Sequence, residues 1–214
     1  MTNAIPLTAG PVLAYLLGSI PFGFVIAKAR GIDIRSVGSG NIGATNVFRS
    51  VGKGWGLLTF LCDFLKGLIP ALLFPLLAEH LGFGRSTDGL RILCAAGAIA
   101  GHNWPIFLQF KGGKGVATSA GALLGIAPAA VGVGLAAWAV MLVTLRYVSL
   151  ASMVAAGAIA GAAWIMRDSG ELLVPLALSA LALLVIARHH GNIRRLLCGT
   201  ESRFNFKRKR GDSA

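Results

Sequence analysis

Charged side chains are scarce in this sequence. Asp, Glu, Lys and Arg together make up 13% of its residues, whereas soluble domains carry about 25%. Hydrophobic residues reach 55% of the chain. This composition excludes an ordinary soluble domain and predicts an integral membrane protein.

Negative charge is the scarcer sign, because 8 Asp and Glu stand against 20 Lys and Arg, giving a net charge of +12. Such an excess suits the binding of nucleic acid, anionic lipid or a phosphorylated substrate.

Metal-binding patterns are missing as well: the three cysteines have no disulfide or metal spacing, and the aspartates are scattered. The N-terminus lacks the basic flank of a cleavable export signal, so we expect the first apolar segment to be retained.

Apolar runs fill most of the chain between residues 8 and 187. A helix that crosses a bilayer needs about 17 to 25 mostly apolar residues. We expect five such spans and two shorter ones, at 8–27, 55–78, 90–101, 115–127, 129–146, 148–166 and 171–187. The sequence thus predicts an all-α integral membrane protein with about seven transmembrane helices. One domain would cover residues 1–204, followed by a basic cytoplasmic tail at 205–214.

The basic residues set the expected orientation, since Lys and Arg concentrate in cytoplasmic loops. With the N-terminus outside, 16 of the 20 basic residues fall on the inner side. Arg85, Arg91 and Arg167 fall outside, and Lys66 lies within a span. The tail sequence KRKR at 207–210 is then an anchor to anionic headgroups, with nucleic-acid binding as the weaker alternative.

Three polar stretches interrupt the apolar runs, at 36–54, 102–118 and 188–201. In the expected topology all three face the cytoplasm, and they are rich in amides, hydroxyls, His and Gly. Glycine-rich turns such as GSGNIG and KGGKG can turn backbone N–H groups towards an anion, and neighbouring Arg and Lys add charge. We therefore expect one shared phosphate-binding site rather than three ordinary loops.

The first stretch contains a literal G-x-G-x-x-G at Gly38, Gly40 and Gly43, with Asp63 following at the spacing of a dinucleotide fingerprint. That fingerprint needs a preceding strand in a soluble domain, which the composition excludes. A Walker pattern is absent too, because Gly115 follows the lysine of GGKGVAT. Asp63 precedes Lys66 by three residues inside an apolar span, which predicts a structural ion pair, with a substrate contact as the alternative.

The stretches GSGNIGATNVFR, GHNWPIF followed by FKGGKGVAT, and RHHGNI, with LCDFLKG between the first two, closely resemble one family over nearly the whole chain. These are the bacterial acyl-phosphate glycerol-3-phosphate acyltransferases, often called PlsY. The resemblance implies transfer of a fatty acyl group from acyl phosphate to the 1-hydroxyl of glycerol 3-phosphate in phospholipid biosynthesis. The expected products are 1-acylglycerol 3-phosphate (lysophosphatidate) and inorganic phosphate.

The resemblance also implies seven membrane helices, a cytoplasmic site, and a location in the bacterial cytoplasmic (inner) membrane. It implies no metal and no other cofactor. The expected partners are the two substrates and membrane lipid, with an upstream acyl-phosphate-forming enzyme as a candidate, and nucleic acid is not expected.

Site roles follow from matching positions. The catalytic candidates are His189, Ser39 and Asn192, and the substrate- and phosphate-binding candidates are Asn41, Arg49, Lys114, Thr45, Lys111 and Glu201. For His189, a general base for the acceptor hydroxyl and a hydrogen-bond donor stay open as roles, and the substrate phosphate is a third acceptor for the proton. His190 is expected to point elsewhere.

Two rival functions are disfavoured. The acyl-CoA class of glycerol-phosphate acyltransferases carries H-x-x-x-x-D, and no histidine in this chain has an aspartate at that spacing. A small anion transporter would also place cations and glycines in a seven-span bundle. Transporters usually bind near the midplane between repeated halves, whereas these motifs lie at one surface of a chain without an evident internal repeat.

Overall fold

The computed structural model describes residues 4–83 and 87–205, and this part of the chain is helical and contains no strand. Arg85 and the predicted KRKR anchor lie outside the described residues. The elements are α1 (Ala4–Gly18), α2 (Phe22–Ala29), α3 (Ala44–Ser50), α4 (Lys53–His80), α5 (Asp88–Asn103), the 3-10 turn η1 (Ile106–Leu108), α6 (Val116–Leu124), α7 (Pro128–Leu145), α8 (Val148–Ile165), α9 (Leu173–Arg188) and α10 (His190–Leu197).

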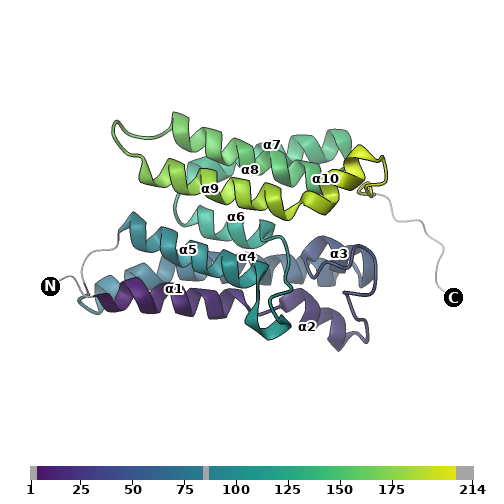
Figure 1. Cartoon of the computed structure of the whole chain (residues 1–214), viewed down its shortest axis with the longest axis horizontal. Helices are drawn as coiled ribbons and strands as arrows, with labels where there is room; N and C mark the ends of the chain where they lie inside the picture. Colours follow the sequence, from purple (N-terminus) through teal and green to yellow (C-terminus); the bar gives the residue numbers. More distant parts are fainter. Residues whose placement is uncertain (1–3, 84–86, 206–214) are drawn as a thin grey trace.

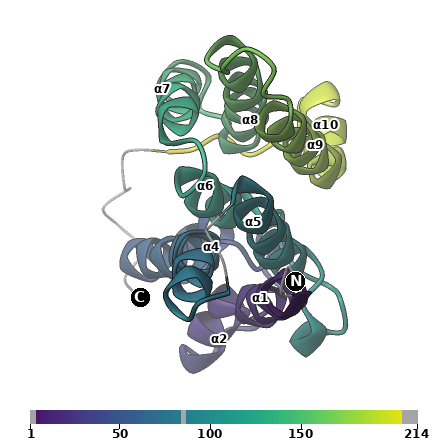
Figure 2. The same cartoon turned by 90° about the vertical axis from the view of Figure 1, so that its left-hand side faces the viewer.

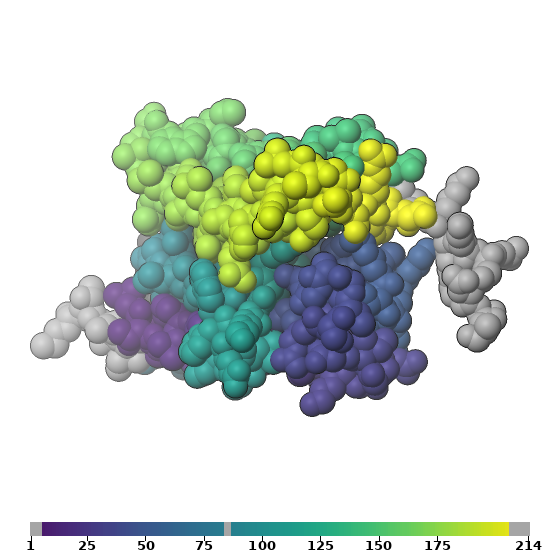
Figure 3. Space-filling model, turned by 45° about the vertical axis from the view of Figure 1, so that its right-hand side comes forward, coloured from purple at the N-terminus to yellow at the C-terminus, as the bar shows by residue number. Residues whose placement is uncertain are grey.

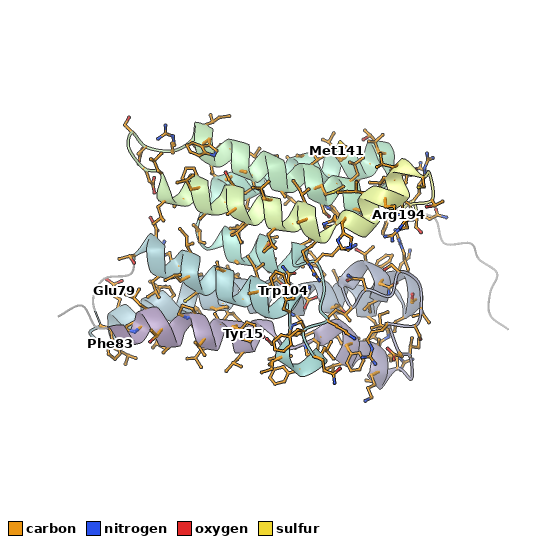
Figure 4. All side chains as sticks on the ribbon, in the orientation of Figure 1. Tyr15, Glu79, Phe83, Trp104, Met141 and Arg194 are labelled. Carbon is orange, nitrogen blue, oxygen red and sulfur yellow. The ribbon has the colours of Figure 1, made fainter. Side chains whose placement is uncertain are left out.

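The long helices lie side by side in two groups with α6 between them (Figure 1, Figure 2). One group contains α1, α4 and α5, with α2 and α3 at one end, and the other contains α7, α8 and α9. The described chain begins at one end of the bundle and finishes at the other (Figure 1). Arg194 lies at the second end, and Glu79 and Phe83 lie at the first (Figure 4).

The expected spans correspond to helices that differ in length. Four segments are long and apolar enough to cross a membrane. A fifth candidate is the pair α9 and α10, which are bent by 57° at their junction, if the two helices are counted as one segment. By contrast, α5 has 16 residues and α6 has 9. At a rise of about 1.5 Å per residue, α6 is roughly 14 Å long, so it does not cross a hydrocarbon core of about 30 Å on its own.

The first expected span is not one continuous helix. It breaks between Gly18 and Phe22, where Pro21 has no N–H to donate. The carbonyl of Ile20, inside the break, accepts hydrogen bonds from the Phe22 N–H at 3.1 Å and from Lys66 Nζ at 2.8 Å. A charged side chain of α4 therefore helps to satisfy a backbone group at the break.

The predicted ion pair between Asp63 and Lys66 is confirmed. Lys66 Nζ lies 2.7 Å from Asp63 Oδ1, and the two side chains are 1% and 3% exposed. His102 Nδ1 lies 3.6 Å from the same carboxylate oxygen. Pairing lowers the cost of burying each charge, which is why both residues can sit inside the bundle.

Small residues allow α1 and α5 to approach very closely. A methyl group on Gly18 would lie 2.2 Å from the carbonyl oxygen of Ala98, and one on Gly101 would lie 2.2 Å from that of Tyr15. No side chain fits at these distances, so glycine is required on both helices.

At its start, α5 is capped by Thr87, whose hydroxyl accepts a hydrogen bond from the Leu90 N–H at 3.3 Å.

Breaking the buried ion pair should destabilise the fold. We expect Asp63→Asn or Lys66→Met to lower the unfolding free energy by roughly 3–5 kcal/mol, because each leaves an unpaired buried charge. Thermal unfolding of the detergent-purified protein measures the loss. The double variant with Asp63→Leu and Lys66→Met should be more stable than either single variant, and a double variant less stable than both would contradict the pairing argument.

Candidate active site

A cleft of about 230 Å³ opens at the end of the bundle where α9 gives way to α10. Its lining comes from all three predicted polar stretches: Ser39, Gly40, Asn41, Gly112, Lys114, Arg188, His190, Gly191, Asn192 and Arg195. Figure 3 shows the blue, teal and yellow segments that carry these stretches meeting on one face of the molecule. The prediction that the stretches meet in one place is confirmed.

The first wall of the cleft is a turn built around Asn46, which is buried in α3. Its side-chain N–H₂ donates to the carbonyls of Ile34, Val37 and Asn41 at 2.9–3.1 Å. Its Oδ1 accepts from the Ser39 N–H at 3.0 Å. The turn therefore uses the hydrogen bonds of the Asn46 amide for its own structure. The exposed Ser39 side chain is left at the mouth.

The second wall is the KGGKG loop, residues 111–115, which wraps around the end of α5. A methyl group on Gly112 would lie 2.2 Å from the His102 carbonyl oxygen, and one on Gly113 would lie 2.1 Å from His102 Nε2. Gly115 has φ of +76°, a conformation that favours glycine. These glycines bring the loop against the end of α5, where the buried His102 packs against it.

The prediction that backbone N–H groups of the glycine-rich turns bind an anion is wrong at four positions, where the N–H group donates to another group of the protein. Ser39 N–H donates to Asn46, Gly40 N–H to Val37 and Gly43 N–H to the Asn41 side chain. Gly113 N–H donates to the His102 carbonyl at 3.0 Å. The glycines of both turns serve close packing at these positions, so side chains have to supply most of the contacts to an anion.

The third wall is the end of α9 and the start of α10, and Arg188 joins it to the second wall. Its Nη2 donates to the carbonyl of Gly113 at 2.8 Å and more weakly to that of Asn103 at 3.4 Å, and its guanidinium lies over the Trp104 ring at 5.4 Å. Arg188 was not among the predicted site residues, although it lies directly before His189 in the third polar stretch.

Lys114 and Glu201 are linked through Asn192. Lys114 Nζ donates to Asn192 Oδ1, and Asn192 Nδ2 donates to Glu201 Oε1 at 2.7 Å. The same carboxylate accepts from Ser149 Oγ at 2.6 Å and from Arg195 Nε at 2.7 Å. Glu201 was expected to bind substrate, but it binds three donors of the protein and holds two cleft side chains in place.

Several positive charges lie close together around the cleft. Burial, together with repulsion from Arg195, Arg188 and Arg49 and against the opposing effect of Glu201, lowers the pKa of Lys114 to about 8. Burial alone would raise the pKa of Glu201, but hydrogen bonds from Ser149, Asn192 and Arg195 lower it overall. At neutral pH the cleft therefore contains a charged lysine beside an ionised glutamate.

The two neighbouring histidines differ in exposure. His189 is 2% exposed and its Nδ1 lies 2.7 Å from the Val185 carbonyl oxygen. Such contact requires the proton on Nδ1, so Nε2 is the basic nitrogen of the neutral ring. His190 lines the cleft and was expected to point elsewhere. The bend between α9 and α10 is what reverses the expected exposure of the pair.

The remaining candidates lie outside the cleft lining. Thr45 is partly exposed on α3, and Lys111 is exposed before the glycines of its loop. Arg49 lines a second, larger hollow of about 1010 Å³ together with Lys53, Trp55 and Leu58. Its Nη2 donates to the Ser202 carbonyl at 3.3 Å. Arg49 is thus placed in a different hollow from Lys114, and Thr45 and Lys111 line neither of the two.

One known protein family matches most of this sequence. Residues 9–199 match the family model for glycerol-3-phosphate acyltransferase. The chain belongs to this family. The glycerol-3-phosphate acyltransferase of Desulforudis audaxviator is 45% identical over 197 residues, covering 92% of this chain and 94% of the relative. That of Geobacter sulfurreducens is 47% identical over 205 residues, covering 95% and 99%.

Solved structures of family members agree with the fold. The crystal structure of PlsY, an integral membrane glycerol 3-phosphate acyltransferase, in its glycerol 3-phosphate form has a TM-score of 0.82 and 41% identity, covering 92% of this chain and 94% of that chain. The lysophosphatidic acid form has a TM-score of 0.79, 40% identity and the same coverage. This chain is accordingly a multi-pass membrane protein of the bacterial family.

Removal of the Glu201 charge should loosen the third wall. In Glu201→Gln one acceptor oxygen becomes an N–H₂ group, so one of the three donors loses its partner. We expect a loss of roughly 1–3 kcal/mol in unfolding free energy. Ser149→Ala, which removes one donor and leaves the carboxylate paired with Arg195, should cost less. Equal thermal stability of Glu201→Gln and the unsubstituted protein would show that the carboxylate does not hold the wall together.

Proposed function

We propose that this protein acylates the 1-hydroxyl of glycerol 3-phosphate, giving lysophosphatidate, and that acyl phosphate is the donor. The observation that carries the proposal is the cleft that Lys114, Arg188 and Arg195 line from separate parts of the chain. Its polar, positively charged lining fits a small phosphorylated alcohol. The family relatives support the reaction, and their names specify the glycerol 3-phosphate acceptor.

In the proposed site, Lys114 and the cleft arginines hold the phosphate of glycerol 3-phosphate. Ser39, Asn41 and Asn192 supply neutral hydrogen bonds at the same mouth. The Lys114 ammonium contributes charge below its pKa of about 8. Glu201 keeps Asn192 and Arg195 oriented while it offsets part of the crowded positive charge. Thr45 and Lys111 take supporting positions on the adjoining loops.

The second hollow suits an amphiphilic donor. Arg49 and Lys53 provide charge for a phosphate, whereas Trp55 and Leu58 form an apolar wall. This wall continues into the exposed leucines of α4, among them Leu61. We assign the acyl phosphate headgroup to Arg49 and the acyl chain to the membrane-facing side of α4. Two hollows would then bind two phosphates, with the transfer taking place between them.

The reaction requires the protein mainly to orient the two substrates and to neutralise their negative charge. An acyl phosphate is a mixed anhydride, so phosphate leaves readily when the acceptor hydroxyl attacks the acyl carbon. Holding the reactants together and placing donors where negative charge develops supplies most of the acceleration. Burial lowers the pKa of His189 to about 4, so its Nε2 is a weak base and the substrate phosphate is our first candidate for the proton acceptor, with His189 as the second.

The proposed membrane arrangement has seven segments, an outside N-terminus and a cytoplasmic site. The cleft, the Arg194 side of the bundle and the start of α4 lie at one end, where most basic residues of the loops also lie. We propose residues 1–204 as one domain and 205–214 as its basic cytoplasmic tail. A cytoplasmic site would receive its donor from an enzyme that forms acyl phosphate.

Donor choice tests the proposal. We expect purified protein with EDTA present to release phosphate and form lysophosphatidate from palmitoyl phosphate and glycerol 3-phosphate. Palmitoyl-CoA in a parallel reaction should give no product. Product from palmitoyl-CoA alone would overturn the donor assignment, and no product from either donor in folded protein would overturn the acyltransferase proposal. Uptake of glycerol 3-phosphate into vesicles without product would instead favour transport.

A further inference from the structure

Residues 104–110, WPIFLQF, connect α5 to the KGGKG loop and are called the aromatic loop below. They fall in a stretch that the sequence pattern marks as polar. The structure nevertheless exposes large apolar side chains here: Ile106 is 48% exposed, Phe107 60% and Phe110 58%. These side chains belong to none of the long helices, so helix packing in the membrane does not account for them.

The aromatic loop lies alongside the first membrane segment. Tyr15 Oη donates to the Trp104 carbonyl at 2.8 Å, and Leu108 packs against a cluster that includes Ala27. Tyr15 belongs to the apolar segment Pro6–Ala29, which is long enough to cross a membrane, and Ala27 in the cluster beside Leu108 belongs to it as well. In Figure 1 the teal loop lies below α5, beside the junction of α1 and α2. The loop is therefore at the depth of a membrane-crossing segment, rather than beyond its end.

Three backbone N–H groups of the loop donate to carbonyls within the loop. The N–H groups of Leu108 and Phe110 donate to the Pro105 carbonyl at 3.1 and 2.9 Å, and that of Gln109 donates to Ile106 at 3.3 Å. Gln109 and Phe110 adopt left-handed backbone conformations, with φ of 52° and 61°. A loop near hydrocarbon needs internal partners for its N–H groups because water is scarce there.

We propose that the aromatic loop inserts into the membrane interface on the side where the cleft opens, with Ile106, Phe107 and Phe110 as its lipid contacts. Aromatic side chains are favoured at this boundary. Lys111 follows directly and is exposed, so its ammonium can reach the phosphates of anionic headgroups. The partner is a lipid surface, and the proposal rests on membrane location rather than on the acyltransfer reaction.

This contact would set the height of the phosphate site above the membrane. Two glycines separate Lys111 from Lys114 along the chain, and Arg188 contacts both the ring of Trp104 and the carbonyl of Gly113. An inserted aromatic loop thereby holds the KGGKG loop close to the lipid surface. A membrane-borne acyl chain and a soluble acceptor could then meet at the same cleft.

Spin labelling measures the depth of the loop directly. The full chain, with Cys62, Cys94 and Cys198 replaced by alanine, receives one cysteine at Phe107 or Phe110 and a nitroxide label. The protein is reconstituted in phosphatidylethanolamine and phosphatidylglycerol vesicles. Collision rates with oxygen, which partitions into lipid, and with a water-soluble nickel complex are compared. Leu65→Cys on α4 gives the lipid reference, and Asp33→Cys in an exposed turn gives the aqueous reference.

We expect the oxygen-to-nickel ratio at residues 107 and 110 to exceed that at residue 33 several-fold and to remain below that at residue 65. A ratio at both loop positions equal to that at residue 33 would overturn the proposal and would point to a protein partner or an unoccupied aqueous surface. All labelled positions are exposed, so folding is maintained and is checked by size-exclusion elution. Acyltransferase activity plays no part in the readout, which keeps this test separate from that of the reaction.

Discussion

Glu201 makes it possible to keep several positive charges in one small cleft. Lys114, Arg188 and Arg195 come together there, and Arg49 is near enough to lower the pKa of Lys114. Without a negative charge among them, mutual repulsion and burial would oppose both the fold and the protonated lysine. The Glu201 carboxylate binds Ser149, Asn192 and Arg195 at once, so it connects α8, α10 and the segment that follows α10.

A second constraint comes from the membrane, where unpaired polar groups are costly. Inside the bundle, the Asp63 and Lys66 pair also helps to satisfy the carbonyl at the break between α1 and α2. At the end of the bundle, polar residues gather where water and soluble substrate are available. The same chain thus uses charge in two ways: as a closed pair in the interior, and as an open cluster that a phosphate can complete.

Much of this was predictable from the sequence. Hydropathy located the long helices, and the spacing of Asp63 and Lys66 predicted their pairing because i and i+3 share a helix face. The motifs indicated that three stretches meet. Helix lengths were less predictable: α6 is only 9 residues long although its apolar run is longer, since the turn around Gly125 and the proline that starts α7 end it early.

Side-chain assignment within the site was harder to predict. Asn46 and Glu201 look like ligand contacts in sequence, but each is used by the protein itself. His189 is buried and His190 is exposed in the cleft. The two residues lie at the bend between α9 and α10, and the periodicity of the sequence does not predict this bend. The sequence also does not show whether a glycine exposes its N–H group to a ligand or allows a neighbouring group to pack closely. In the KGGKG loop, Gly112 and Gly113 allow close packing against His102.

The central claim is that the cleft around Lys114 binds the phosphate of glycerol 3-phosphate. With a pKa of about 8, Lys114 should react with an amine-directed acetylating reagent at pH 8 faster than ordinary lysines. Peptide mass spectrometry can follow its modification in the reconstituted protein, with exposed Lys28 as the internal reference. We predict that saturating glycerol 3-phosphate slows modification of Lys114 at least several-fold and that glycerol does not. Equal rates with and without glycerol 3-phosphate would contradict the account.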